Sequence, residues 1–206
     1  MARRVGSNGA ETAEKLRNAA LELFARSGYA AVSMRAIAAE TGVQAGAIYN
    51  HFPTKQDLLN ELLRVHMETL LTSWEEVSEP GLAPPQALEQ FVRFHIRYHL
   101  DRSREVFISY MELRSLEDEN FSAIERLRRD YEKVPRAILE RGAADGSFDI
   151  IDPQLTTMAM IAMLTGMTTW YRENGRLSLD EIEAVYVRLV ARLVGQKGKL
   201  KCSRRA

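Results

Sequence analysis

Residues 16–59 decide the fold, and they read LRNAALELFARSGYAAVSMRAIAAETGVQAGAIYNHFPTKQDLL. At the start of this stretch, apolar residues recur with the i, i+3, i+4, i+7, i+8 spacing of an amphipathic helix: Leu16, Ala19, Ala20, Leu23 and Phe24. This pattern predicts a helix over residues 11–27. Gly28 follows at the place where a glycine commonly ends a helix.

Two short helices follow, joined by a tight turn. Ser33 can cap the first of them. That helix is expected to bury three apolar side chains, those of Met34, Ile37 and Ala38. Thr41–Val43 is the turn, and Gln44–Asn50 is predicted as the third helix. Such a pair is typical of a helix-turn-helix, whose second helix enters the DNA major groove, although the pattern alone also fits an ordinary corner between two helices.

The rest of the chain also has helical periodicity. Thr54–Asp57 forms a capping box that opens a long helix to about Val77, and the proline-rich run at residues 79–85 ends it. Three further apolar faces follow: Leu88, Phe91, Val92, His95, Ile96 and His99; Phe107, Tyr110 and Met111; and Phe121, Ile124, Leu127, Tyr131, Val134 and Ile138, with a kink near Pro135.

Two capping signals mark the last helices. Asp152-Pro153 opens a helix to about Arg172, and Ser178–Glu181 opens another to about Val194. No segment alternates with period two, and no internal repeat is evident. We therefore expect an all-α fold of about nine helices.

Taken whole, the quoted stretch resembles the DNA-binding domain of TetR-family repressors. The matching segments are residues 19–29, 32–38, 41–43 and 46–52, followed by Lys55, Leu58 and Leu59. The resemblance implies a homodimeric repressor of transcription that a small ligand releases from a palindromic DNA operator. It implies a helix-turn-helix DNA-binding domain over residues 1–55, a ligand-binding and dimerisation domain over residues 56–195, and a basic tail over residues 196–206.

The resemblance also implies which residues meet DNA. Gln44, Ala45 and Gly46 would face base edges, because an amide can pair with adenine and a small residue lets the backbone approach the bases. The other expected contact positions are Ser33, Arg35, Tyr49, His51 and Lys55, of which the tyrosine and lysine of the family motif usually touch phosphates.

Some side chains near this surface have a second interpretation. Ile48 and Phe52 are expected in the core rather than on DNA. Tyr49 can pack inward and expose its hydroxyl alone. His51 either contacts DNA or locks the third helix onto the fourth.

The charges are unevenly distributed although the net charge is zero. Residues 1–56 carry seven bases against four acids, residues 195–206 carry five bases and no acid, and the middle is therefore negative by eight. Arg3 and Arg4, ahead of the first helix, are placed like arms that reach the minor groove. The basic tail is either a second DNA arm or, as we favour, a solvated end.

The helix predicted at residues 153–172 is apolar nearly all round. Such a helix must be buried on every side. In a chain of 206 residues, one side would face the subunit core and the other a second subunit. The last helix offers Ile182, Val185, Leu189 and Leu193 as a companion stripe, so two helices from each subunit would form a four-helix dimer bundle.

The second half also carries residues suited to a ligand cavity. We expect an acyl group to lie among Phe91, Tyr110, Met111, Met163 and Met167. His95 and His99 lie on one apolar face, where neutral imidazoles can donate to a ligand carbonyl. Their spacing also fits a metal, but there is no third ligand at a readable spacing, so no metal is expected.

The run Trp170–Ser178 resembles a segment of a TetR subgroup that responds to acyl-CoA thioesters in lipid or steroid catabolism. Glu173 departs from it, since a proline often stands there in that subgroup. Arg172 and Arg176 beside Trp170 suit a flat polyanionic head group. The same arginines also fit an ordinary helix end, where cations complement the dipole.

Several function classes are excluded or disfavoured. The chain has no glycine-rich phosphate loop or serine elbow, and its one cysteine is Cys202, so we expect neither an enzyme nor a cofactor. No apolar run is long enough to span a membrane, and a cytoplasmic protein is expected. A drug-responsive repressor of an efflux pump and a DNA-binding protein without a ligand stay open. Ligand binding would push on the helix at residues 54–77, which belongs to both domains.

Overall fold

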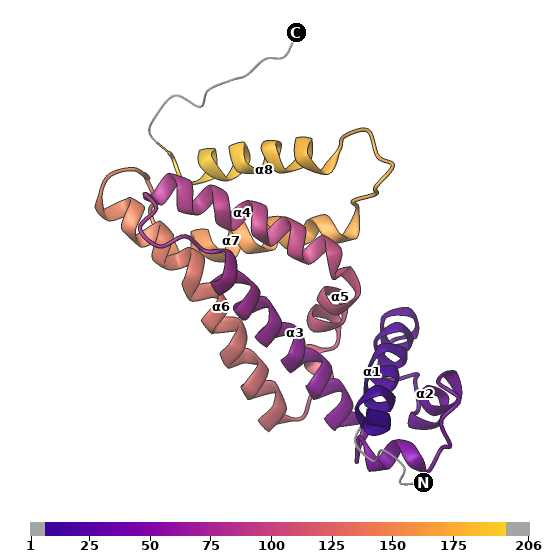
Figure 1. Cartoon of the computed structure of the whole chain (residues 1–206). Helices are drawn as coiled ribbons and strands as arrows, with labels where there is room; N and C mark the ends of the chain where they lie inside the picture. Colours follow the sequence, from indigo (N-terminus) through magenta and orange to yellow (C-terminus); the bar gives the residue numbers. More distant parts are fainter. Residues whose placement is uncertain (1–6, 197–206) are drawn as a thin grey trace. The chain divides into compact units, whose positions relative to one another are not determined.

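The computed structural model describes residues 7–196, with side chains from Gly9 onward. Every regular element among these residues is helical, which confirms the all-α prediction (Figure 1). The eight α-helices are α1 (Ser7–Ser27), α2 (Met34–Glu40), α3 (Lys55–Val77), α4 (Pro84–Asp101), α5 (Ser103–Met111), α6 (Asp118–Ala144), α7 (Pro153–Thr165) and α8 (Leu179–Leu193). The short 3-10 helices are η1 (Ala47–Asn50), η2 (Leu113–Ser115) and η3 (Gly166–Thr169).

Capping side chains fix where three helices begin. The Ser33 hydroxyl oxygen accepts a hydrogen bond at 3.2 Å from a backbone N–H in the first turn of α2. At the start of α3, Asp57 N donates to Thr54 Oγ1 at 3.0 Å while Thr54 N donates to Asp57 Oδ2 at 2.9 Å. Ser178 and Glu181 make the same reciprocal pair at α8. These three predicted caps are confirmed, as is the fourth, Asp152, at the start of α7.

Two helices are shorter than predicted. The helix expected over Gln44–Asn50 is present only over Ala47–Asn50, as the 3-10 helix η1; before it, Ala47 N bonds back three residues, to Gln44 O at 2.8 Å, in a turn. Helix α7 starts after the predicted Asp152 cap but ends at Thr165 rather than near Arg172. There the hydroxyls of the next threonines bond back three residues to backbone carbonyls, which favours the tighter η3.

The face of α5 that the sequence suggested as apolar is turned outward. Phe107, Tyr110 and Met111 are exposed, whereas Val106 and Ile108 are buried. Helix α5 has nine residues and carries apolar side chains on both faces. Periodicity in so short a segment therefore did not determine which face packs inward.

The described chain divides into two compact units. The first contains the residues up to Thr69 together with Arg102–Arg128, and the second contains Leu70–Asp101 together with the residues from Arg129 onward. Helices α3 and α6 contribute residues to both units. The expected domain boundary after residue 55 is a different division and stays a prediction.

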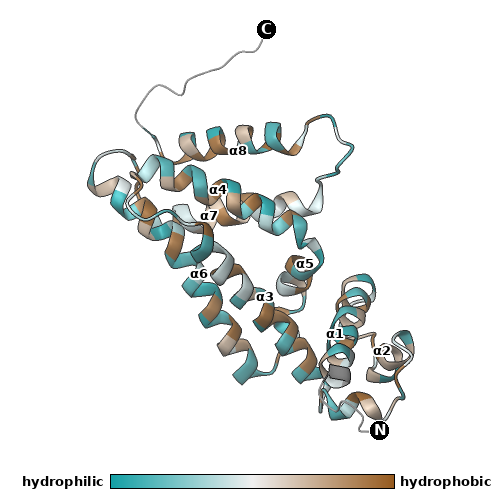
Figure 2. Cartoon of the chain, in the orientation of Figure 1, coloured by the Kyte–Doolittle hydropathy of each residue, from teal (hydrophilic) through white to brown (hydrophobic). Residues whose placement is uncertain are grey.

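Each unit has its own core. In the first unit, α1 packs on α2 and α5, and Phe24 meets the Tyr29 ring edge-on at 5.2 Å. In the second unit, α4 packs on α7 and α8, and Trp74 meets Phe91 edge-on at 5.4 Å. Figure 2 shows that α8 carries both hydrophobic and hydrophilic residues around its axis. Within the described residues, no helix is long and apolar enough to cross a membrane.

A buried carboxylate joins α8 to α4. The Glu183 side chain is fully buried, and Arg93 and Arg97 reach it from α4 with partly exposed side chains. Glu183 Oε2 accepts hydrogen bonds from Arg93 Nη1 at 3.2 Å and Arg97 Nη2 at 2.9 Å. Arg97 Nε lies 2.6 Å from Glu183 Oε1, outside good hydrogen-bond geometry, so this second oxygen is stabilised by charge. A buried carboxylate of this kind destabilises the fold unless cations such as these two arginines pair with it.

We predict an asymmetric response when this ion pair is broken. The double variant Arg93→Ala/Arg97→Ala leaves a buried carboxylate without cations and should lose about 3–5 kcal/mol of unfolding free energy. Adding Glu183→Leu removes that charge and should restore most of the loss. Urea unfolding at neutral pH and one protein concentration measures both values. Equal stability of the double and triple variants would show that Glu183 is not an energetically buried charge.

Candidate nucleic-acid interface and effector site

The turn between α2 and η1 is held by backbone geometry. Gly42 has φ +69°, a left-handed conformation that favours glycine. The Thr41 hydroxyl donates to Ala38 O at 3.0 Å, and Val43 N donates to the same carbonyl at 2.9 Å. These bonds close the end of α2, as the sequence predicted for Thr41–Val43. The residues after the turn are thereby presented on the surface.

Two buried side chains anchor the segment after the turn. Ile48 and Phe52 are buried, which confirms that they belong to the core. Gln44, Ala45 and Gly46 are all exposed. A Cβ built on Gly46 would meet nothing within 4 Å, so packing within the chain does not require a glycine there. The segment is thus fixed from inside and open outside, as a surface for close approach to a base edge must be.

The remaining predicted contact residues differ in their surroundings. Ser33 and Arg35 are exposed at the start of α2, and the Ser33 hydroxyl is also the helix cap. Tyr49 is 48% exposed, so it does not pack inward. His51 is half-buried after η1. Contact of these side chains with DNA stays a prediction.

Lys55 has an internal role that its sequence position did not reveal. Its Nζ donates to Tyr29 O and to Val32 O, both at 2.9 Å, and lies 4.1 Å from the centre of the Tyr29 ring. An ammonium group has three N–H donors, so one is left for a phosphate. Lys55 therefore ties the turn after α1 to the start of α3, whether or not it also contacts DNA.

A hydrogen-bond network connects the helix-turn-helix to the segment between α5 and α6, within the same unit. Tyr29 N donates to Glu112 Oε1 at 3.0 Å. Gln56 Nε2 donates to the Tyr29 hydroxyl at 3.1 Å and to Ser115 O at 2.6 Å, and Gln56 Oε1 accepts from Glu117 N at 3.1 Å. Burial raises the pKa of the Tyr29 hydroxyl, so it stays protonated. Sequence reasoning missed this network, because its members are 27 to 83 residues apart.

In the second unit, His95 and His99 form the centre of a buried polar cluster. His95 is hydrogen-bonded through Nδ1 to the Tyr131 hydroxyl at 2.9 Å and through Nε2 to Thr165 Oγ1 at 3.0 Å. His99 Nδ1 donates to His95 O at 2.9 Å, and the two imidazoles stack at 3.7 Å. Burial lowers the pKa of His95 to about 3, so this ring is neutral at pH 7. Its partners Tyr131 and Thr165 carried no sequence signal of this role.

The other predicted effector residues belong to two different units. Phe91 and Met167 are buried in the second unit, where the Phe91 ring lies 5.8 Å from His95, and Met163 is half-buried. Tyr110 and Met111 belong to the first unit and are exposed, and the Arg128 guanidinium lies 4.6 Å from the Tyr110 ring. The effector assignment of these residues therefore stays a prediction.

The segment after α7 is exposed. Trp170 lies outward and stacks on Tyr186 at 6.4 Å between ring centres. Arg172 and Arg176 are both exposed, and Arg172 Nη1 donates to Tyr171 O at 2.7 Å. The arginines are thus open to a charged ligand, as predicted, but their binding to one is not tested by this geometry.

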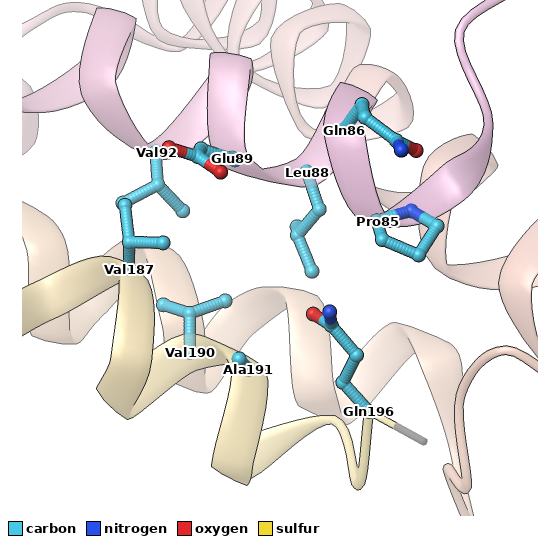
Figure 3. A pocket seen from close by; sticks show the side chains of 9 residues that line it. All are labelled: Pro85, Gln86, Leu88, Glu89, Val92, Val187, Val190, Ala191 and Gln196. Carbon is cyan, nitrogen blue, oxygen red and sulfur yellow. The ribbon is translucent and has the colours of Figure 1, made fainter. Parts of the chain in front are cut away.

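A groove between α4 and α8 was not foreseen. Figure 3 shows Leu88 and Val92 on one side of it and Val187 and Val190 on the other. Glu89 and Gln196 are among its polar lining residues. The groove contains none of the predicted effector residues, so it is not part of the candidate effector site.

Comparison with known proteins gives two family matches that together span most of the chain. Residues 16–62 match the model for bacterial regulatory proteins of the tetR family, and residues 81–194 match that for the tetracyclin repressor-like C-terminal domain. The chain is 29% identical over 188 residues to the HTH-type transcriptional repressor KstR2 of Rhodococcus jostii, covering 90% of this chain and 91% of that protein.

Two solved structures are also similar. A bacterial regulatory protein in the tetR family from Rhodococcus RHA1 superposes with a TM-score of 0.84 at 32% identity, covering 91% of this chain and 99% of that one. AibR, solved in complex with isovaleryl coenzyme A and operator DNA, superposes with a TM-score of 0.78 at 21% identity, covering 90% and 99%. The second of these likenesses concerns the fold alone.

Variants at Gln44 and Lys55 should separate base reading from phosphate contact. Gln44→Ala should change which bases are preferred, by roughly 1–3 kcal/mol for a lost bidentate contact. Lys55→Ala should weaken binding to all sequences and lower the salt slope by about 0.9. Because the Lys55 ammonium also donates to two backbone carbonyls, the Lys55→Ala variant should have a lower melting temperature as well.

The measurement is fluorescence anisotropy on a panel of operator variants at several salt concentrations. Arg64→Ala is the matched control, since Arg64 is an exposed cation on the same helix α3. If Gln44→Ala and Lys55→Ala both lowered affinity uniformly and left sequence preference intact, the segment after the turn would not be the reading element.

Proposed function

The chain belongs to the TetR family of bacterial transcriptional regulators, and from this premise we propose that it is a dimeric repressor that an acyl-CoA thioester releases from a palindromic operator. The observation that carries the DNA-binding part is the exposed segment Gln44–Gly46, held from inside by Ile48 and Phe52. As a cytoplasmic regulator, it would meet both DNA and metabolic thioesters.

The proposed dimer surface is the outward face of α7 and α8 in the second unit. Helix α7 buries Met160, Ile161 and Leu164, but its other side is uncovered in the single chain. The exposed apolar side chains proposed for this surface are Leu155, Val185, Leu189 and Leu193, together with Ala159 and Ala162 of α7. Exposed apolar side chains gathered on two helices mark an interaction surface, and a second copy of the same surface is self-complementary about a twofold axis.

An acyl-CoA is proposed as the effector for two reasons. AibR, a neighbour in fold, was solved in complex with isovaleryl coenzyme A and operator DNA, and the run Trp170–Ser178 of this chain resembles a segment of an acyl-CoA-responsive TetR subgroup. The residues proposed for the acyl part are Phe91, His95, His99, Tyr110, Met111, Met163 and Met167. Trp170, Arg172 and Arg176, exposed after α7, are proposed for the anionic head group.

Release follows from unequal affinity for two states of the repressor. A ligand that binds the DNA-bound and the free form equally well does not shift the equilibrium between them, however tightly it binds. The acyl-CoA must therefore favour a form that fits the operator less well. In a twofold dimer, a change in the distance between the two copies of Gln44–Gly46 loses contacts at both half-sites, which lie about 34 Å apart.

The dimer is tested by one charged substitution. Leu189→Glu places a carboxylate on the apolar face of α8 and should yield a monomer at micromolar concentration. The matched control is Val65→Glu on α3, because Val65 and Leu189 are each 41% exposed. Sedimentation equilibrium gives the mass, and a binding-site selection should enrich a palindrome with the parent protein. A monomeric parent protein with no palindrome enriched would contradict the proposal.

Effector release is tested by competition in a mobility shift. Medium-chain and ring-bearing acyl-CoA should free the operator, whereas coenzyme A, free fatty acids and a cationic dye should not. Arg172→Gln/Arg176→Gln should raise the effective acyl-CoA concentration about tenfold or more, since charged hydrogen bonds contribute about 1.5–3 kcal/mol. Release by the dye alone would replace the acyl-CoA proposal with a drug-responsive repressor. No release by any compound would favour a DNA-binding protein without a ligand of these classes.

A further inference from the structure

A second groove, in the second unit, lies between α6 and α7, and three cations line its α6 side. They are Arg129, Lys133 and Arg136. Positions i, i+4 and i+7 lie on one face of a helix, so the three side chains leave α6 in a row. At 1.5 Å per residue, this row is about 10 Å long. The groove therefore presents a line of positive charge rather than a single point.

The ion pairs of these cations lie at the surface. Lys133 Nζ is 2.7 Å from Asp130 Oδ1, and Arg136 Nε is 3.4 Å from Glu140 Oε1. Both pairs are between side chains that are 40% to 63% exposed. Exposed pairs of this kind contribute about 0–1 kcal/mol, so an anion with more negative charge can replace the carboxylates. Arg136 contacts Glu140 through Nε, and its two terminal nitrogens can still grip a phosphate in the fork geometry of a guanidinium.

The opposite wall has a different chemistry. Gln154, near the start of α7, supplies an amide that can donate to an oxygen, and Met158 supplies an apolar surface that is 54% exposed. Among the described lining residues, Glu132 is the single acid. A row of cations facing an amide and a thioether suits a ligand with both a phosphate ester and an apolar or aromatic part.

We propose that this groove binds the phosphate ester of an organic ligand, with Arg129, Lys133 and Arg136 holding the phosphate oxygens and Met158 contacting the ligand's apolar part. Two sources carry this chemistry. The first is the nucleotide end of an acyl-CoA, which rests on the proposed function and would take this groove in place of Arg172 and Arg176. The second is a free nucleotide, which does not rest on the proposed function. The site differs from the proposed head-group residues Arg172 and Arg176, because those follow the C-terminal end of α7 while the groove is formed by its first turns.

Calorimetry on the full chain tests the site directly. The probes are coenzyme A, ADP, inorganic phosphate and a free fatty acid. The variant Arg129→Gln/Arg136→Gln should weaken coenzyme A and ADP binding about tenfold or more, since a loss of 1.4 kcal/mol is tenfold in affinity. The control Arg126→Gln/Arg141→Gln removes two exposed arginines of the same helix that do not line the groove, and it should bind like the parent.

Operator release separates the two sources. If the groove variant loses both ADP binding and release by acyl-CoA, the nucleotide end of acyl-CoA is the occupant. If it loses ADP binding and keeps release, the groove takes a free nucleotide, and the proposed function stands independently. Three results would each overturn the proposal, whether or not acyl-CoA releases the operator. The groove and control variants could bind ADP and coenzyme A equally well. Alternatively, the parent protein could bind inorganic phosphate alone, or none of the probes at millimolar concentration.

Discussion

The segment at residues 44–50, which we propose reads DNA, is too short to hold its own shape, and the first unit is built around that constraint. A 3-10 helix of four residues has few internal hydrogen bonds and poor bond geometry. Its position must come from neighbours, namely Ile48 and Phe52 in the core and the Lys55 ammonium bound to two carbonyls after α1. Hydrogen bonds from a half-buried cation to carbonyls fix a direction, which an apolar contact does not. Lys55 thereby fixes where α3 begins relative to the turn that precedes α2.

The second unit meets a different constraint, since its helix α7 is apolar enough to need covering on two sides. One side of α7 is covered within the chain, and the other side of the same helix stays exposed. The polar groups that remain inside are therefore paired closely: Glu183 with two arginines, and His95 with Tyr131 and Thr165. An unpaired polar group in such surroundings costs about 1–3 kcal/mol, so these pairs specify how α4 packs on α8 and α6.

Local signals predicted the fold well where one residue decides the outcome. Ser33, Thr54 and Ser178 each begin a helix because a hydroxyl oxygen reaches a free backbone N–H, and this needs only the next three residues. The face of α5 and the end of α7 were not predictable in this way, since packing and threonine hydroxyls further along the chain decide them. For the candidate site, the exposed positions Gln44–Gly46 followed from the motif, whereas the structural role of Lys55 depends on carbonyls 23 and 26 residues away.

The state of the histidines constrains how any anionic effector is recognised. Burial lowers the pKa of His95 to about 3, so the ring carries no charge near neutral pH and gives no electrostatic attraction to phosphate. Both its nitrogens already have protein partners, and a ligand that used them would first break the bond to Tyr131 or Thr165. Such an exchange adds little binding free energy unless the ligand also makes a hydrogen bond to the hydroxyl that has lost its partner. The interior therefore suits the neutral part of a ligand, a carbonyl or a hydrocarbon. Under both proposals above, the charge of the ligand is recognised by arginines at the surface before and after α7, where water can solvate them until a ligand binds.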